Sequence, residues 1–172
     1  MQAVLKPLSL DYLDAMMSWV NDSAITEKFA KFNSRITREE EISHIKQMMA
    51  SRQDKAFVME SEEGKYLGNI SLHEIDRYAQ KARMSILIAS KEERGKGYGE
   101  SAIRQLLKIA FNQLNLHKIW LVVFEENEKA KGLYRKCGFQ EEGILTDEYF
   151  VKGKYHNMVR MAIIKAKWRE TK

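Results

Sequence analysis

The sequence predicts one α/β domain in which helices cover a mixed, mostly antiparallel sheet. Two observations predict this class: apolar residues recur at helical spacing in several segments, and apolar runs of strand length lie between those segments. The length of 172 residues is that of a single domain, and a hydrophobic share of 44% with one cysteine excludes disordered and disulfide-stapled chains. We therefore expect residues 1–172 to form a single domain around one core.

Helices are predicted in the part of the chain that precedes residue 52. Ser9 caps the first helix, whose apolar positions at helical spacing are Leu13, Met16, Met17 and Val20. A short helix is predicted over residues 24–32. Thr37 and Glu40 form a capping box, in which each side chain can bind a free backbone amide, and this box opens a helix over about residues 37–51. The apolar face of that helix is predicted to contain Ile42, Ile45 and Met49.

Strands dominate the remainder of the chain, with further helices between them. A hairpin is predicted around Gly64, because two β-like runs flank a turn that contains this glycine. Gly138 is predicted to end a helix as its left-handed cap. The predicted strands are residues 56–59, 65–72, 83–88, 118–124, 139–149 and 155–163, and the predicted helices are about residues 98–113 and 127–137. The last two strands are expected to form a closing hairpin.

Charge and composition limit the partners of the chain. It has 29 basic and 24 acidic residues, a net charge of +5, but the two signs are interspersed, so nucleic acid is not an expected partner and part of the excess can serve an anionic small ligand. No apolar run approaches the ~20 residues of a membrane span, and residues 1–7 lack the pattern of a signal peptide. We expect a cytoplasmic protein without a membrane partner. Four scattered histidines and one cysteine show no zinc-ligand spacing, so no metal is expected.

A cluster of glycines marks the candidate ligand site. Gly95, Gly97 and Gly99 fall close together, with Arg94 and Lys96 interleaved, between a predicted strand and a predicted helix. Glycines allow successive backbone amides to point into one concavity, and a helix start adds about half a positive charge. The segment is therefore expected to bind phosphate oxygens, with the two cations as counter-charge.

The spacing of the cluster selects among phosphate-binding loops. No Gly-Lys pair of the chain is followed by serine or threonine, which excludes the mononucleotide loop, and Gly99 follows Gly97 one residue too soon for the dinucleotide fingerprint. What remains is Arg-x-x-Gly-x-Gly, formed by Arg94, Gly97 and Gly99. This pattern resembles the pyrophosphate loop of the GNAT superfamily of acetyl-coenzyme A-dependent N-acetyltransferases, which has the form Gln/Arg-x-x-Gly-x-Gly/Ala.

A second segment carries the same resemblance. Residues 127–139 are similar to the family's Asn-x-x-Ala-x-x-x-Tyr-x-x-x-Gly-Phe, with every anchor at its expected offset. The resemblance covers about residues 4–164 and points to the branch that holds ribosomal-protein N-terminal and spermidine acetyltransferases. It implies acetyl-CoA as cosubstrate and an amine as acceptor, in a family whose members are often dimers or larger.

The resemblance also implies roles for individual residues. Tyr134 lies where the family has the donor to the leaving thiolate, since a phenol can give a proton or a hydrogen bond to sulfur. Backbone amides near Leu87 and Ile88 resemble the family's site for gripping pantetheine and polarising the thioester carbonyl. The other implied coenzyme-binding residues are Arg94, Gly95, Lys96, Gly97, Tyr98, Gly99, Asn127, Lys129 and Ala130. Asn127 can cap the following helix at the same time.

A general base is needed as well, because an alkyl amine with a pKa of ~10.4 is almost fully protonated at neutral pH. Glu74 is the candidate: it lies at the end of a strand expected to border the acceptor cleft, where a partly buried carboxylate can have a raised pKa. A solvated carboxylate or a water relay is the alternative. His73 is predicted to alternate to the other face with a structural role, and Cys137 to act as a small buried hydrophobe.

The acceptor amine stays open among several classes. Spermidine enzymes carry acidic residues after their second helix, whereas residues 31–35 here read Lys-Phe-Asn-Ser-Arg, a departure from that pattern. Residues 19–22 resemble a segment of relatives that acetylate nucleotide-linked amino sugars, and ribosomal-protein amino termini fit equally. The alternative from another class is a non-catalytic coenzyme A-binding sensor, against which the intact Tyr134 counts.

Overall fold

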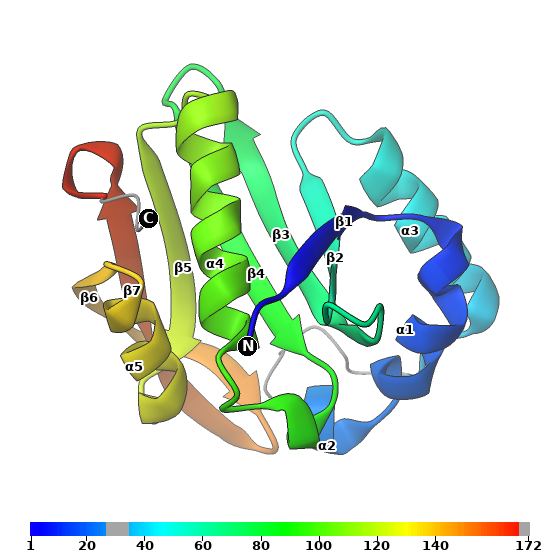
Figure 1. Cartoon of the computed structure of the whole chain (residues 1–172). Helices are drawn as coiled ribbons and strands as arrows, with labels where there is room; N and C mark the ends of the chain where they lie inside the picture. Colours follow the sequence, from blue (N-terminus) through cyan, green and yellow to red (C-terminus); the bar gives the residue numbers. More distant parts are fainter. Residues whose placement is uncertain (27–34, 169–172) are drawn as a thin grey trace.

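The computed structural model describes residues 1–26 and 35–168, which contain a seven-stranded sheet with helices on both faces (Figure 1). The strand order is β1-β2-β3-β4-β5-β7-β6. The strands are β1 (Val4–Pro7), β2 (Lys55–Glu60), β3 (Tyr66–Asp76), β4 (Lys81–Ile88), β5 (Lys118–Phe124), β6 (Gln140–Val151) and β7 (Lys154–Ile164). The α-helices are α1 (Leu13–Val20), α2 (Ser23–Thr26), α3 (Arg38–Ala50), α4 (Tyr98–Lys108) and α5 (Glu128–Lys136). Within these residues no helix is long and apolar enough to cross a membrane.

Each face of the sheet has its own helical cover. Adjacent residues of a strand face opposite sides, and Val58 and Met59 of β2 mark the two sides. Met59 joins the core cluster beneath α4, which includes Ile103 of that helix. Val58 instead packs against Leu13 of α1 and Ile45 of α3. Helices α4 and α5 therefore cover one face, as Figure 1 shows, and α1 and α3 cover the first strands of the other.

The predicted α/β class and most predicted elements are confirmed. The capping box is present, since the Thr37 hydroxyl accepts a bond from the Glu40 amide (3.2 Å) and the Glu40 carboxylate accepts one from the Thr37 amide (2.7 Å). Helix α5 has Asn127 as its N-cap, and Gly138 follows it with a left-handed φ of 95°. The helix predicted near Tyr98 is α4, continued by a π-helical turn over Ile109–Gln113.

Other predictions differ from the structure. Strand β1 was not predicted, because it is a four-residue edge strand whose last residue is Pro7, and proline lowers the strand signal. Met49 lies outside the buried face of α3, with 55% of its surface exposed. Strand β3 runs to Asp76, four residues beyond the predicted end, because a bulge extends its pairing with β4. The helix predicted over residues 24–32 begins as α2, and residues 27–32 lie outside the described residues.

Strands β4 and β5 diverge, and this divergence positions the candidate site. They are the parallel neighbours in the described sheet, and they pair only where Lys81–Arg83 lies beside Lys118–Trp120. Beyond that point β4 keeps its pairing with β3 as far as Ile88, and β5 keeps its pairing with β7 as far as Phe124. The carboxyl ends of β4 and β5 thus border an opening in the sheet. Helices α4 and α5 begin at the same edge, because each follows one of these strands.

The burial of two methionines provides a test of the fold. Met59 is fully buried beneath α4, whereas Met49 is largely exposed on α3. We expect Met59→Ala to lower the free energy of unfolding by about 2–5 kcal/mol through lost burial and a residual cavity. The matched variant Met49→Ala should change it by no more than about 0.5 kcal/mol. Denaturant unfolding of both variants measures the difference, and equal destabilisation would contradict the described packing.

Candidate active site

The opening between β4 and β5 has an unpaired backbone edge along one side. Beyond Arg83 the strand β4 rises roughly 16 Å to Ile88, and over this stretch it pairs with β3 but not with β5. Peptide groups of a strand alternate between its two neighbours, so those that do not bond to β3 face the opening. This edge, which includes Leu87 and Ile88, can form hydrogen bonds with an extended ligand that carries amide groups.

A loop with left-handed glycines follows the carboxyl end of β4 and leads into α4. Gly97 is the N-cap of α4 and has a φ of 93°, a conformation that side-chain-bearing residues rarely adopt. The first amides of α4 have no partner within the helix, and the helix dipole makes this end positive. Gly99 has a different role, because a Cβ there would lie 3.2 Å from Leu133 Cδ2 of α5 and 3.4 Å from Ile88 Cδ1 of β4. Its missing side chain lets α4 approach both neighbours.

The two cations of the loop are engaged within the loop itself. Arg94 donates from Nε and Nη2 to the Ile88 carbonyl oxygen, at 3.2 and 3.0 Å. Lys96 pairs with Glu93 at 3.0 Å, and Lys65 pairs with the same carboxylate at 2.7 Å. These two lysines hold the pKa of Glu93 below its usual range. Arg94 thus fixes the end of β4 and Lys96 is paired within the loop, and the role of both as counter-charge to a ligand stays a prediction.

The side chain of Tyr98 lies in the core, so any coenzyme contact predicted for this residue falls to its backbone. Tyr98 is 8% exposed and belongs to the cluster beneath α4. Tyr98 is the first residue of this amphipathic helix, and it lies on the same buried face as Ala102, one turn further on. Only the backbone amide of Tyr98 is left to face a ligand at the helix start.

Helix α5 begins beside this loop. The Asn127 side chain accepts a hydrogen bond from the Ala130 amide at 3.2 Å, as an N-cap does. Lys129 is exposed at the same helix start, and Ala130 packs against the core. The predicted capping role of Asn127 is confirmed, and contact between this helix start and a coenzyme stays a prediction.

Tyr134 lies one turn further along α5, on the α4 face of the sheet. Its ring packs against Phe139, with centroids 6.0 Å apart, and it adjoins the main core cluster. Burial raises the pKa of Tyr134 to about 12, so the phenol keeps its proton at neutral pH. The hydroxyl makes no hydrogen bond with a described residue, and no buried polar side-chain atom of these residues lacks a partner, so the hydroxyl reaches solvent. The Tyr134 hydroxyl is therefore a hydrogen-bond donor that has no acceptor among the described residues.

The only cysteine of the sequence behaves as predicted. Cys137 is 4% exposed at the end of α5. Burial raises the pKa of its thiol to about 11, which leaves almost no thiolate at neutral pH. A small buried hydrophobe is therefore confirmed, and nucleophilic chemistry at this sulfur is not supported.

The structure corrects the description of Glu74. Its side chain is 60% exposed, and its carboxylate accepts a hydrogen bond from Nε of Arg83 at 2.8 Å. It lies at a bulge of β3 with a φ of 53°, which breaks the alternation that the sequence predicts for this strand. The Glu74 carboxylate is therefore neither partly buried nor free, whereas the sequence had led us to expect a partly buried one. Glu74 and Arg83 form an exposed ion pair beside the point where β4 leaves β5.

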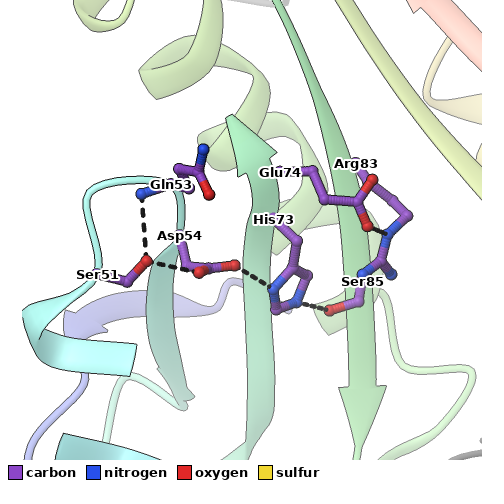
Figure 2. A network of polar contacts seen from close by, with 7 residues as sticks. All are labelled: Ser51, Gln53, Asp54, His73, Glu74, Arg83 and Ser85. Carbon is purple, nitrogen blue, oxygen red and sulfur yellow. Dashed lines mark hydrogen bonds and ion pairs between the residues drawn. The ribbon is translucent and has the colours of Figure 1, made fainter. Parts of the chain in front are cut away.

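A polar network that the sequence does not reveal lies next to this ion pair (Figure 2). His73 Nδ1 is 2.9 Å from Asp54 Oδ1, and His73 Nε2 is 2.9 Å from Ser85 Oγ. Ser51 in turn donates to Asp54 at 2.6 Å. The only sequence signal was a histidine and a serine on facing strands; the register that joins them, and the loop that brings Asp54, come from the fold.

Comparison with known proteins identifies the family. Residues 2–140 match the family model described as an acetyltransferase (GNAT) domain. The chain belongs to this family. It is 41% identical over 115 residues to the spermidine N(1)-acetyltransferase of Vibrio cholerae, a match that spans 67% of this chain and 66% of that protein. It is 41% identical over 110 residues to the Escherichia coli K12 enzyme of the same name, spanning 64% and 58%. The matches thus cover less than two thirds of either relative.

The three-dimensional likeness extends further than the sequence matches. A crystal structure of spermidine N-acetyltransferase from Vibrio cholerae in complex with CoA and spermine superimposes with a TM-score of 0.90. The two chains are 32% identical, and the superposition covers 96% of this chain and 97% of the other. The resemblance inferred from Arg94, Gly97, Gly99 and residues 127–139 is confirmed, as is the mixed, mostly antiparallel sheet of the GNAT acetyltransferase fold.

Gly97 provides a test of the proposed phosphate cradle. Gly97→Val places a branched side chain at a left-handed position among the amides that start α4, so we expect coenzyme A affinity to fall at least about tenfold. Gly64→Val is the matched control, because Gly64 is also left-handed, at φ 81°, but lies in the hairpin turn between β2 and β3. Isothermal titration should show near-normal affinity for that control. Equal affinity in both variants would reject the cradle.

Proposed function

We propose that this GNAT-family chain is an acetyl-CoA-dependent N-acetyltransferase that acetylates a primary amine. The observation that carries the proposal is the opening between β4 and β5, bordered by a free backbone edge and by the starts of α4 and α5. Coenzyme A combines a pyrophosphate with an extended arm that contains amides. A positive helix start and a free strand edge are the two surfaces that such a molecule needs.

The described residues fit this cosubstrate. The amides that follow Gly97 can hold the pyrophosphate, and the edge of β4 near Leu87 and Ile88 can bind the pantetheine arm. Arg94 keeps the Ile88 carbonyl occupied, so this carbonyl does not face the ligand as an unpaired acceptor. Bound acetyl-CoA supplies the thioester. The chain contributes the binding surfaces, the orientation of the thioester and the proton donors around it.

Tyr134 is proposed as the donor to the departing sulfur. A thiolate leaves more readily when a donor stabilises it, and a thiol has a pKa of ~8.5. Because the pKa of Tyr134 is about 12, complete proton transfer from the phenol to the thiolate is uphill by roughly 5 kcal/mol, whereas a hydrogen bond to the sulfur carries no such cost. We therefore assign Tyr134 the role of hydrogen-bond donor in the reaction.

Removing this hydroxyl tests the assignment. We expect Tyr134→Phe to lower kcat about 10- to 100-fold while coenzyme A affinity changes less than about twofold, because the hydroxyl acts on the leaving sulfur and not on the bound coenzyme. Tyr78→Phe is the control, since Tyr78 is fully exposed in the turn between β3 and β4. Thiol release measures turnover, and titration measures affinity. Unchanged turnover in Tyr134→Phe would reject the donor role.

The acceptor is best approached with a panel of amines. Spermidine comes first, because the relatives that are 41% identical are named spermidine N(1)-acetyltransferases and the superimposed structure contains spermine. Peptide amino termini and nucleotide-linked amino sugars complete the panel. We expect thiol release that requires both acetyl-CoA and at least one of these amines. Coenzyme A binding without release from any of them would favour the alternative, a non-catalytic sensor.

A further inference from the structure

The contacts of His73 follow directly from the register of two strands. In the antiparallel pair β3 and β4, Ser71 lies opposite Ser85 and His73 lies opposite Arg83. Opposed residues share a face, so His73 and Ser85 are diagonal neighbours on one side of the sheet. The residues between them, Leu72 and Met84, point into the core beneath α4. His73 and Ser85 therefore project from the face opposite α4, where Leu87 packs beneath α1 and α2.

The His73 ring is held on both sides. Asp54 binds Nδ1 and Ser85 binds Nε2, each at 2.9 Å, and Figure 2 shows the three side chains in a row. The side chains of His73 and Asp54 are 20% and 26% exposed, so the ring is neither sealed in the core nor free in solvent. A carboxylate on one nitrogen and a hydroxyl on the other is the arrangement in which an imidazole takes a proton from the hydroxyl side.

The charges around the ring favour a protonated intermediate. Burial opposes the ionisation of Asp54, but hydrogen bonds from Ser51 and His73, with the charges of His73 and Arg83, hold the pKa of Asp54 below its usual range. Among the described residues, Arg83 and its partner Glu74 are charged groups that lie beside the network. An imidazolium at His73 would thus be paired with the Asp54 carboxylate, and the strand register places Arg83, which is neutralised by Glu74, opposite it. Lys55, at the start of β2, alternates to the opposite face.

The network also lies beside the part of β4 that borders the opening. Arg83 is the last residue of β4 that pairs with β5, and Ser85 comes two residues later, where the strand borders the opening. Tyr134 belongs to the α4 face of the sheet, whereas Ser85 projects from the opposite face. Acyl transfer needs this separation, because the amine must attack the thioester carbonyl from one side while the sulfur leaves toward another.

We propose that Asp54, His73 and Ser85 form a proton relay that deprotonates the acceptor amine. This inference rests on the proposed acetyltransferase function and deepens it. The acceptor attacks as the neutral amine, after its ammonium proton has passed to solvent. As the C–N bond forms and the C–S bond breaks, a proton passes from the amine nitrogen to Ser85 Oγ, and the hydroxyl proton of Ser85 passes to His73 Nε2. Asp54 holds the resulting imidazolium through Nδ1. The imidazolium then loses its proton to solvent, and the departing thiolate takes one from solvent. Ser85 would contact the amine and His73 would act through it.

The pH dependence of turnover tests the relay. His73 must be neutral to accept a proton, so kcat/KM of the wild-type protein should rise with pH through the inflection at which His73 loses its proton. In His73→Gln the inflection should disappear, and kcat/KM should fall about 100-fold. In Asp54→Asn the inflection should move to lower pH, because loss of a negative charge disfavours the imidazolium. His117→Gln is the control, since His117 is exposed in the loop before β5.

The serine and a binding measurement complete the experiment. Ser85→Ala should lower kcat about as much as His73→Gln, and Ser85→Thr should restore part of it because it keeps a hydroxyl. Coenzyme A titration of each variant should give near-normal affinity, which shows that the site has folded. If His73→Gln does not fold, the shift of the inflection in Asp54→Asn decides.

The outcomes separate the two proposals. A wild-type inflection that survives unchanged in His73→Gln would overturn the relay while leaving the acetyltransferase function intact. The same conclusion follows if Ser85→Ala retains full turnover, or if every variant loses activity without any change in the shape of its pH profile. Wild-type protein that binds coenzyme A but acetylates no amine in the panel would overturn the function and the relay together.

Discussion

The candidate site depends on one feature of the sheet. Strands β4 and β5 stop pairing beyond Arg83 and Trp120. A sheet can be opened in this way because each strand keeps a complete partner on its other side, β3 for β4 and β7 for β5. Gly68 shows how closely β3 holds the diverging strand, since a Cβ at this position would lie 2.0 Å from the Leu87 carbonyl oxygen. The backbone edge exposed by the opening is what a coenzyme can bind, and the helix starts beside it supply the positive charge.

The opening also divides the chemistry between the two faces of the sheet. Tyr134 belongs to the face that α4 and α5 cover, and its surroundings are apolar, which keeps the phenol protonated. His73 and Ser85 belong to the other face, where the cover of α1 and α3 gives way to polar residues. The proposed hydrogen-bond donor and the proposed proton relay therefore lie on opposite faces of the sheet.

The sequence predicted local features better than features that depend on strand register. The capping box at Thr37, the glycine loop before α4 and the Asn127 cap of α5 follow from residues that are close together in the chain, and the structure contains each of them. The network around His73 joins residues 12 and 19 positions apart, and nothing in the local pattern encodes the pairing that brings them together. The expected partial burial of Glu74 was wrong for a related reason: strand alternation was assumed across a bulge, and the carboxylate there is exposed and paired with Arg83.

The proposed relay lies on the face of the sheet opposite α4, which we call the acceptor face. Ion pairs on this face affect the choice of amine more directly than the net charge of +5 does. Glu74 is held by Arg83, Glu142 lies between Lys118 and Arg160, and the guanidinium of Arg160 stacks 4.2 Å from the centre of the Trp120 ring. A cationic acceptor that bound one of these carboxylates would have to displace a cation already in place, which cancels much of the electrostatic gain. Selection on this face therefore depends on whether an amine can replace those internal partners or can approach Ser85 without disturbing them. Because these ion pairs are distant in the sequence, the residue types alone could not indicate that the acidic groups were already occupied.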